Sequence, residues 1–527
     1  MKRLMTLLLA AGMLFGAATG ASAIDFKAKG QWLMGFGYGD GHLIDSMRIA
    51  DGPNTKTNAE DKFKAMQRVR LQLEAAASEY VSGTVYFEIG DTTWGKAGED
   101  GRSGGALGAD STNIIKLKNA YLDWTVPTTD ARVRMGIQGV ALPNKAGGSA
   151  VLDDDIAGVV ASYKFNDNVS LTALWLRPVN DNYDKDYATK SSQISYLDNI
   201  DIFGLAIPIT FDGFSVTPWA AFGQMGRNAF ANYRDDYSYT WNNYITSTYA
   251  NAVNKVYGTN FDGTSSVSPT GKAYGNIFFA GIPIAITAFD PLNIEFDANY
   301  GYGESMGYFP AFRDLDNLSI ATVRKGSTQR QGWLAKALVE YKTDFGTPGI
   351  FGWYASGDDG NVKNGSERMP AISPCGNFTS FLGDGPMGWA PSYLFYDRSL
   401  SYAGTWGIGA RLKDFSFVED LKHSITVAYW GGTNSPSMVK YMATSTDWEL
   451  GADGTYGGPY LTTNDGLLEI NFINNYQMYE NLEMVLELGY IANLVDNGTW
   501  NQTNTHKAVT YKKQDAYKAQ VVFAYTF

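Results

Sequence analysis

The chain has 527 residues, of which 14% are aromatic and 58 are glycine, and its formal net charge is −12. A negative chain of this kind repels a phosphate backbone, so nucleic acid is excluded as an expected partner. The single cysteine, Cys375, cannot form an intramolecular disulfide, which excludes a disulfide-stabilised fold.

The chain begins with a segment typical of export. The basic pair Lys2-Arg3 precedes an apolar run over residues 4–18, and residues 21–23 read Ala-Ser-Ala, which matches an A-x-A cleavage site. The run is shorter than the roughly 20 apolar residues that a spanning helix needs, so an anchor helix is the weaker alternative. We expect residues 1–23 to be a cleaved signal peptide, followed by a single domain over residues 24–527.

Side chains of alternating polarity begin directly after the signal peptide. In residues 26–38 aromatic and apolar side chains share one face, and Lys27, Lys29 and Gln31 share the other. This period of two predicts a strand rather than a helix. Residues 63–77 and 81–91 alternate in the same way and are joined by a tight turn.

The same unit of strand, short turn, strand and long loop recurs along the whole chain, and no Pro-rich or charge-block linker interrupts it. We expect about eighteen strands, with sixteen as the alternative, and an even number is typical of bacterial membrane barrels. These strands cover residues 26–38, 63–77, 81–91, 113–125, 131–139, 157–165, 169–177, 197–208, 213–224, 272–288, 292–303, 330–343, 349–356, 400–413, 421–431, 464–477, 482–495 and 516–527.

The connections differ at the two strand ends. Compact turns such as residues 127–130 and 290–291 alternate with long loops, of which residues 225–271, 357–399 and 432–463 are the longest. Short periplasmic turns and long extracellular loops are typical of outer-membrane barrels. A soluble sandwich also alternates, but it seldom needs this many strands or this much loop.

The last strand, residues 516–527, alternates without a fault and ends on an aromatic residue, Phe527. Its aromatic face favours contact with lipid, where only a closed sheet leaves no backbone group unpaired. We therefore predict an all-β, transmembrane antiparallel β-barrel. Rings near strand ends are expected in the headgroup zone, namely Trp32, Tyr121, Trp175, Tyr300, Trp333, Tyr341, Tyr429, Tyr476, Tyr490 and Tyr525.

Basic side chains concentrate on the polar faces of the early strands, which would face the interior. They are Arg68, Arg70, Lys116, Lys118, Arg132 and Arg134. The register of residues 113–123 is ambiguous, so Lys116 and Lys118 fit this pattern less well than the arginines. A solvated strand face is the simpler interpretation of alternate arginines.

The third long loop, between residues 139 and 157, carries Gly147, Gly148 and three consecutive acids, Asp153, Asp154 and Asp155. The residues alone suggest two roles for these aspartates: capping a short helix that starts at Ile156, or binding Ca²⁺ together with loop carbonyls. No other metal or cofactor motif is present, so we expect no cofactor beyond weak Ca²⁺ binding in the loops.

The signal peptide, the first strand GQWLMGFGYG, the arginine-rich polar faces, the third long loop and the terminal Phe527 together resemble the general trimeric porins of Gram-negative outer membranes. Homotrimeric porins of sulfate-reducing bacteria are the most similar group. The resemblance implies a homotrimer in the outer membrane that admits small hydrophilic solutes and ions by passive diffusion. It also implies recognition of Phe527 by the barrel-assembly machinery.

In that family the third long loop folds into the lumen and narrows it. The resemblance therefore implies that Asp153, Asp154 and Asp155 face a basic wall across a water-filled constriction. Opposed charges across such a constriction create a transverse field, which gives sieving with a charge bias.

Three other functions remain open. A porin selective for sugars or small anions fits the arginines in part, although acidic residues interrupt them. The large Tyr-, Asn- and Ser-rich loops could make the chain a surface adhesin or receptor. An outer-membrane phospholipase needs a His beside a Ser, and no such pairing can be argued for His42, His423 or His506, so we do not expect an enzyme.

Overall fold

The computed structural model describes residues 24–41, 43–49, 54–56, 63–96, 105–106, 115–180, 199–226, 268–269, 272–312, 323–376, 378–379, 402–441, 449–450, 458–501 and 509–527. Residues 1–23 lie outside this part of the chain, so the signal peptide stays a prediction. His42 and His506 lie outside it too.

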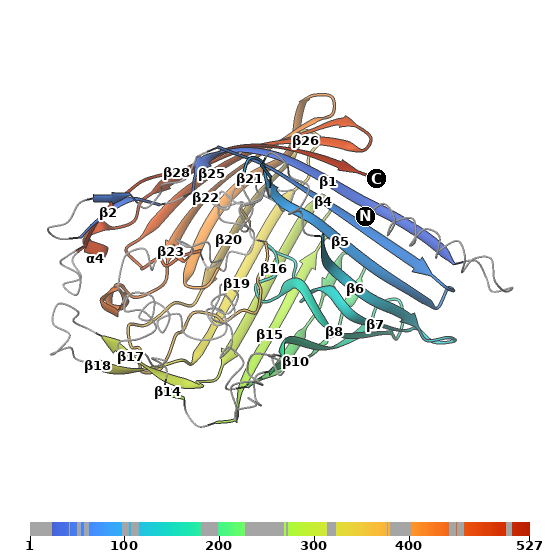
Figure 1. Ribbon diagram of the computed structural model, residues 1–527, viewed down its shortest axis with the longest axis horizontal. Coiled ribbons are helices and arrows are strands. Elements are labelled where there is room, and N and C mark those ends of the chain that lie inside the picture. Colours follow the sequence, from blue (N-terminus) through green and yellow to red (C-terminus); the bar gives the residue numbers. More distant parts are fainter. Residues whose placement is uncertain are drawn as a thin grey trace.

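The main sheet is closed and antiparallel (Figure 1). Its first strand hydrogen-bonds to the second on one side and to the last on the other. The spanning strands are β1 (Asp25–Asp40), β4 (Phe63–Ala76), β5 (Val81–Thr93), β6 (Ile115–Thr125), β7 (Ala131–Ala141), β8 (Asp153–Lys164), β9 (Ser170–Asn180), β10 (Asn199–Ala206), β13 (Trp219–Gly226), β15 (Tyr274–Ile286), β16 (Leu292–Gly303), β19 (Arg330–Tyr341), β20 (Thr347–Ala355), β21 (Thr405–Val418), β22 (Leu421–Gly432), β25 (Gly466–Tyr479), β26 (Leu482–Asn493) and β28 (Ala516–Thr526).

Two further strands of this sheet, β11 (Ile209–Phe211) and β12 (Phe214–Val216), continue β10 and β13 toward their common turn. Pro208 and Pro218 interrupt the two strands at neighbouring positions, because proline has no N–H to donate to a sheet. Counting each interrupted strand once, the barrel has 18 strands.

The predicted fold is confirmed, since each expected strand overlaps one strand of the barrel. Two strands have bounds that differ from the expected ones by several residues. β8 begins at Asp153 and not at residue 157. The strand expected over residues 400–413 runs instead over Thr405–Val418, because a register shift near Asp414, whose φ is 58°, lets Phe415 and Val418 continue pairing.

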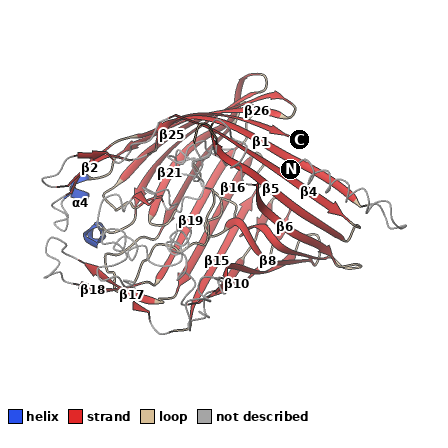
Figure 2. Cartoon of the chain, in the orientation of Figure 1, coloured by secondary structure: helices blue, strands red, loops and turns tan. Residues whose placement is uncertain are grey.

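Short turns join the strands at one rim, and the other rim carries the long connections with most of the small elements (Figure 2). These elements are β2 (Ile44–Ile49), β3 (Asn54–Lys56), β14 (Ser268–Pro269), β17 (Gly307–Phe312), β18 (Val323–Ser327), β23 (Glu449–Leu450), β24 (Gly458–Pro459), β27 (Val509–Lys513), the 3-10 helix η2 (Pro436–Tyr441) and α4 (Asn497–Asn501). No helix in the described ranges is long and apolar enough to cross a membrane.

Alternation along each strand separates an apolar outer face from an inner face. In β10, Phe203 and Leu205 are 53% and 55% exposed, whereas the flanking Ile202 and Ala206 lie inside and are almost fully buried. Trp32 on β1 and Ile350 on β20 are exposed in the same way. Large apolar side chains exposed around a closed sheet are what a lipid-facing surface requires.

Phe527 completes the closure of the barrel at the junction of the chain ends. Its N–H donates to the carbonyl of Gly30 at 3.1 Å, and the Gly30 N–H donates back to its carbonyl at 2.9 Å. The phenyl ring occupies the space where a side chain at Gly30 would stand, since a Cβ there would lie 2.4 Å from the ring. Glycine in the first strand thus makes room for the terminal aromatic residue.

Candidate functional site

The connection between β7 and β8, residues 142–152, folds into the barrel, and we call it the third loop. Its base is closed by a hydrogen bond from the Leu142 N–H to the Leu152 carbonyl at 2.9 Å. Ala146, Val151 and Leu152 are completely buried. The predicted inward course of the third long loop is therefore confirmed, and apolar side chains hold it inside.

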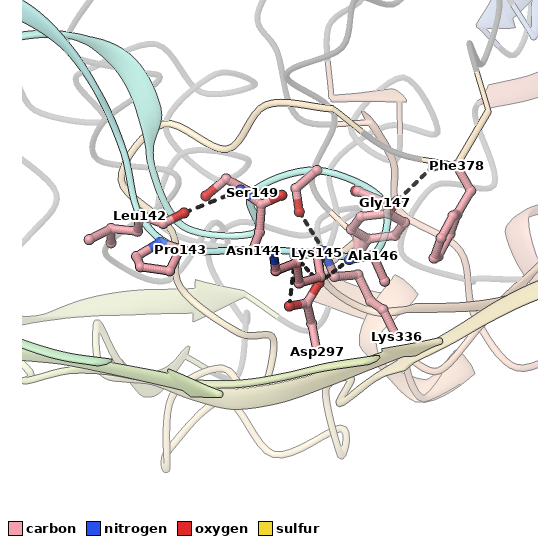
Figure 3. Close-up of polar contacts among 12 residues, drawn as sticks. Leu142, Pro143, Asn144, Lys145, Ala146, Gly147, Ser149, Asp297, Lys336 and Phe378 are labelled. Atoms are coloured by element: carbon pink, nitrogen blue, oxygen red, sulfur yellow. Dashed lines mark hydrogen bonds and ion pairs between the residues drawn. The ribbon is translucent and has the colours of Figure 1, made fainter. Parts of the chain in front are cut away.

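The far side of the third loop is anchored to the inner wall by Asp297 on β16 (Figure 3). The Asp297 carboxylate accepts hydrogen bonds from the backbone N–H of Lys145 at 3.1 Å and of Ala146 at 2.6 Å. Lys336 on β19 lies 3.5 Å from the same carboxylate and donates to the Gly148 carbonyl at 2.5 Å. Both charged side chains are buried, so each depends on the other and on the loop backbone.

Gly147 and Gly148 form the tip of the third loop, with φ values of 59° and 78°. This left-handed conformation strongly favours glycine. Space is limited too, because a Cβ at Gly148 would lie 2.5 Å from the Cys375 carbonyl oxygen. Glycine is thus required at this tip, because the third loop passes close to the backbone at Cys375.

That neighbour belongs to the long β20–β21 connection, whose described residues 357–376, with 378 and 379, we call the inner arm. Ser149 and Cys375 exchange backbone hydrogen bonds of 2.9 and 3.0 Å, and the Asp153 N–H donates to the Ser373 carbonyl at 2.8 Å. The third loop and the inner arm are therefore hydrogen-bonded as a pair inside the barrel. The inner arm was not predicted from the sequence, although its apolar segment from Met369 to Ile372 is a signal of burial.

An aromatic cluster fills the interior beside this pair. Phe378 of the inner arm stacks on Phe351 of β20, with ring centroids 4.7 Å apart, and Trp353 meets Trp430 at 4.5 Å. The Tyr402 hydroxyl donates to the Gly147 carbonyl and accepts from the Phe378 N–H, each at 2.9 Å. Tyr402 therefore links the third loop, the inner arm and the wall.

The inner arm is also held by buried charges at its start. The Asp358 carboxylate accepts from the Ser366 and Tyr460 hydroxyls, both at 2.6 Å. Burial raises the pKa of Asp358 above its usual value, although the charge of Arg368 opposes that shift. Burial and the neighbouring Asp358 and Asp359 carboxylates raise the pKa of Glu367 to about 7. A hydrogen bond that the Asp359 N–H donates to the Glu367 carboxylate opposes this shift.

The predicted basic wall lies on β4 to β7, away from these anchors. Arg70 pairs with Glu88 of the adjacent strand at 2.8 Å. Arg68 lies 3.7 Å from Asp91 and is nearly buried. These arginines are thus partly neutralised within the wall itself.

Arg132 and Arg134 on β7 share one carboxylate, that of Asp123 on β6, at 3.0 and 2.8 Å. Arg134 also lies over the Tyr121 ring, 4.3 Å from its centroid. Tyr121 therefore packs beside an interior arginine, and its expected place in the outer aromatic zone is wrong. Two guanidinium groups against one carboxylate leave a local excess of positive charge near the short-turn rim.

Lys118 on β6 pairs with Asp155 on β8, and the Asn119 amide donates to the same carboxylate at 2.7 Å. Lys116 lies opposite Glu88 in the β5–β6 register. Of the expected acid–base contacts, the structure thus brings together Lys118 and Asp155. It does not bring the aspartates to Arg132 or Arg134, which use Asp123.

The three aspartates form the first residues of β8, so their placement in the loop is corrected. They do not cap a helix at Ile156, which is part of the same strand. Ordering into a strand is possible because Asp155 is held by Lys118, and Asp154 accepts from the Ser373 hydroxyl at 2.7 Å. Among the residues described, no group of three or more His, Cys, Asp or Glu side chains could hold a metal ion.

His423 is the one histidine within the described ranges. Its Nδ1 lies 2.6 Å from the Asn474 amide oxygen, and its ring stacks on Phe472. These contacts are those of a packed side chain on the outer face near the short turns.

Taken together, the interior has two kinds of wall. On β16 and β19 the charged side chains of Asp297, Lys336 and Glu340 are buried, beside the third loop, the inner arm and the aromatic cluster. On β4 to β7, Arg132 retains 55% side-chain exposure and Arg134 32%. The third loop and the inner arm can thus narrow a water-filled channel, so that solutes pass close to the charged wall on β4 to β7.

No family model matches the sequence, and no curated protein matches it. Among solved structures, OccK5 (OpdH) of Pseudomonas aeruginosa is 10% identical, with 95% of this chain and 98% of that chain covered and a TM-score of 0.46. OprD of the same organism is 12% identical, with 97% of both chains covered and a TM-score of 0.45. The outer membrane channel DcaP of Acinetobacter baumannii is 9% identical, with 97% and 99% covered and a TM-score of 0.38. At these identities no residue role is carried over to this chain.

Proposed function

We propose that the protein is an outer-membrane porin, which lets small hydrophilic solutes and ions cross by passive diffusion. The observation that carries this proposal is a closed barrel with a lipid-facing exterior and, on β4 to β7, an inner wall of solvent-exposed ion pairs. A membrane barrel of this size encloses an aqueous channel when its interior is not filled. The third loop and the inner arm set the width of that channel.

The constriction lies between the anchored loop pair and the charged wall. Arg70, Arg132 and Arg134 keep part of their surface accessible, so we assign them the charge bias of the channel. Arg68, Lys116 and Asp154 remain proposed members of the same constriction. Asp153 and Asp155 alternate with Asp154 along β8 and share the outer side of Met135 and Ile137, so the pair of Lys118 and Asp155 lies away from the lumen.

A selective channel for small anions is the second candidate. It is favoured by the two guanidinium groups that share Asp123, since this site carries a net positive charge. General diffusion accounts for the remaining ion pairs, such as Arg70 with Glu88, which are locally neutral.

Reconstitution in planar bilayers tests the function. We expect discrete ohmic conductance steps, and a reversal potential under asymmetric KCl that reports the charge preference. Liposome swelling with sugars of graded size then measures the size limit. Absence of any conductance from correctly folded barrels would contradict the proposal and favour a role as adhesin or receptor.

We further propose that the barrel assembles as a homotrimer and that Phe527 is read by the barrel-assembly machinery, as the porin resemblance implies. Light scattering in detergent checks the first point, with a mass of three chains expected. Deletion of Phe527 checks the second, with slower assembly in cells expected. The deletion also removes the hydrogen bonds to Gly30, so a Phe527→Leu variant that keeps the backbone is the matched comparison.

A further inference from the structure

The outer face of the barrel carries a polar row directly beyond its last lipid-facing aromatic residues, on the strands from β9 to β16. In the aromatic row, the strand register aligns Trp175, Phe203, Phe222, Phe278 and Tyr302 across five neighbouring strands. One step closer to the long loops, the polar row consists of Arg177, Asp201, Gln224, Asn276 and Glu304.

These polar side chains point outward and not into the lumen. Asp201 lies between Ile200 and Ile202, which are buried inside at 0% and 1% exposure. Its carboxylate accepts a hydrogen bond from the Trp175 indole N–H at 2.8 Å, and that ring is on the exposed outer face. Gln224 and Asn276 are exposed and alternate with interior residues in the same way.

A β-bulge lies within the polar row. The register between β9 and β10 shifts between Ile200 and Ile202, so Arg177 and Pro178 together face Asp201. Bulges re-aim side chains, and proline is tolerated in them because no N–H is needed for the ladder. Arg177 follows the outward Trp175 by two residues and so points outward as well, and its guanidinium donates to both Asp201 oxygens at 2.8 and 3.0 Å.

The site is polar but balanced in charge. Arg177 is neutralised by Asp201, which also accepts from the Asn199 amide at 2.6 Å. At the other end of the row, Lys272 pairs with Glu304, which also accepts from the Asn276 amide at 2.9 Å. A surface without excess cations is poorly suited to a phosphate, whereas planar amides and carboxylates beside aromatic rings are suited to hydroxyl groups.

We propose that the polar row is a binding surface for the saccharide headgroup of the glycolipid in the outer leaflet, with the aromatic row at the boundary to its acyl chains. The position supports this occupant, because the polar row is continuous with the lipid-facing band and lies at its long-loop border, which faces outward in outer-membrane barrels. The proposal rests on the outer-membrane location proposed above but not on transport.

The test compares glycolipid binding by the wild-type barrel and by the triple variant Asp201→Ala, Gln224→Ala, Asn276→Ala in phospholipid nanodiscs. The probe is deep-rough lipopolysaccharide, and native mass spectrometry measures the bound fraction. Loss of several hydrogen bonds predicts affinity at least about tenfold weaker for the variant. The matched control, Thr210→Ala, Asp212→Ala, Thr287→Ala, changes exposed polar residues at the opposite ends of the same hairpins and should bind like the wild type.

Two further binding measurements test the proposal, one with a dephosphorylated glycolipid and one with a single variant. Dephosphorylated glycolipid should bind the wild type almost as well as the intact lipid, since the site recognises sugar hydroxyls; a large loss would show phosphate recognition and overturn the proposal. The single variant Gln224→Ala, at an exposed position, should retain the fold and weaken binding about twofold to fivefold. If the triple variant bound glycolipid as tightly as the wild type, the proposal would also be overturned. That result would favour coverage of the polar row by the chain's own loops.

Bilayer conductance of the same variants separates this inference from the proposed function. All variants should conduct like the wild type, because the substitutions lie outside the lumen. A barrel that binds glycolipid through the polar row but carries no current would refute the porin proposal and leave this one standing.

Discussion

The two inner walls of the barrel use similar residues for different purposes. On β16 and β19, Asp297 and Lys336 are buried and fix the backbone of the third loop. On β6 and β7, Asp123, Arg132 and Arg134 form an ion-pair group that keeps contact with solvent. The comparison teaches that charge in a barrel interior does not by itself identify a pore lining. Burial and hydrogen bonding to a loop distinguish an anchor from a wall that meets solute.

The largest expected effect comes from breaking the anchored wall. Lys336→Ala leaves the Asp297 carboxylate buried without its cation, and removal of one partner of a buried pair typically costs about 3–5 kcal/mol. We expect the third loop to detach, with a higher single-channel conductance and a new protease-sensitive site near residues 145–148. Arg132→Ala, on the exposed wall, is the control and should leave protease resistance unchanged.

A smaller effect is expected at the contact between the third loop and the inner arm. Gly148→Val introduces a side chain at φ 78° and brings a Cβ within 2.5 Å of the Cys375 carbonyl oxygen. The left-handed backbone alone costs a branched residue at least about 1–2 kcal/mol. Hydrogen exchange should therefore rise at the Ser149 and Cys375 amides. Gly139→Val should not change it, because a Cβ there would meet the Asp155 carboxylate oxygen at 3.6 Å, an ordinary contact distance.

The next effect is a pH dependence confined to the inner arm. Since the pKa of Glu367 is raised to about 7 from an ordinary value of 4.5, the docked arm favours the protonated form. Its contribution to docking is fully present below about pH 4.5 and is lost as the pH rises through 7. Burial raises the pKa of Asp358 as well, which adds to the same trend.

Proteolysis or hydrogen exchange of residues 357–376 at pH 5.5 and pH 8.5 measures this effect. We expect weaker protection at the higher pH in the wild type. Glu367→Gln should reduce the dependence, because the amide mimics the protonated acid. An equal dependence in that variant would assign the effect to Asp358.

The smallest effect on stability is expected at the exposed wall. Arg132→Ala with Arg134→Ala removes two partly solvated cations, and exposed ion pairs are typically worth about 0–1 kcal/mol. Unfolding should therefore change little. The reversal potential should shift toward cation preference, because Asp123 is left without its arginines. An unchanged reversal potential would remove both arginines from the conducting path.

Much of the fold could be predicted from the sequence, because alternation is a local signal that each strand carries by itself. Residues 516–527 show it in full, and β28 matches them. Strand boundaries were harder to predict where a bulge intervenes, as at Asp414, because a bulge breaks the alternation without ending the strand. Three consecutive aspartates suggested a loop, but partners distant in the chain, Lys118 and Ser373, hold them in β8.

The candidate site was less predictable for the same reason. The alternation of side chains identified Arg132 and Arg134 as residues of the polar face. It could not reveal their pairing with Asp123, because that pairing depends on the register of two strands. The anchor between Asp297 and the third loop joins residues 151 and 152 positions apart, which no local pattern can reveal. The same holds for the inner arm, because its docking depends on side chains from several distant segments, among them Arg330, Tyr402 and Tyr460.

The long sequence separation of the Asp297 anchor also has a consequence for assembly. The acceptor lies on β16, whereas the donors Lys145 and Ala146 lie between β7 and β8, and β9, β10, β13 and β15 stand between them in the sheet. The contact therefore forms only when these intervening strands are already paired. Docking of the third loop is therefore expected among the late steps of maturation, because contacts between distant parts of a chain form after local ones. A partly assembled barrel would therefore lack the docked third loop, and its lumen would narrow to the final width only after the sheet has closed.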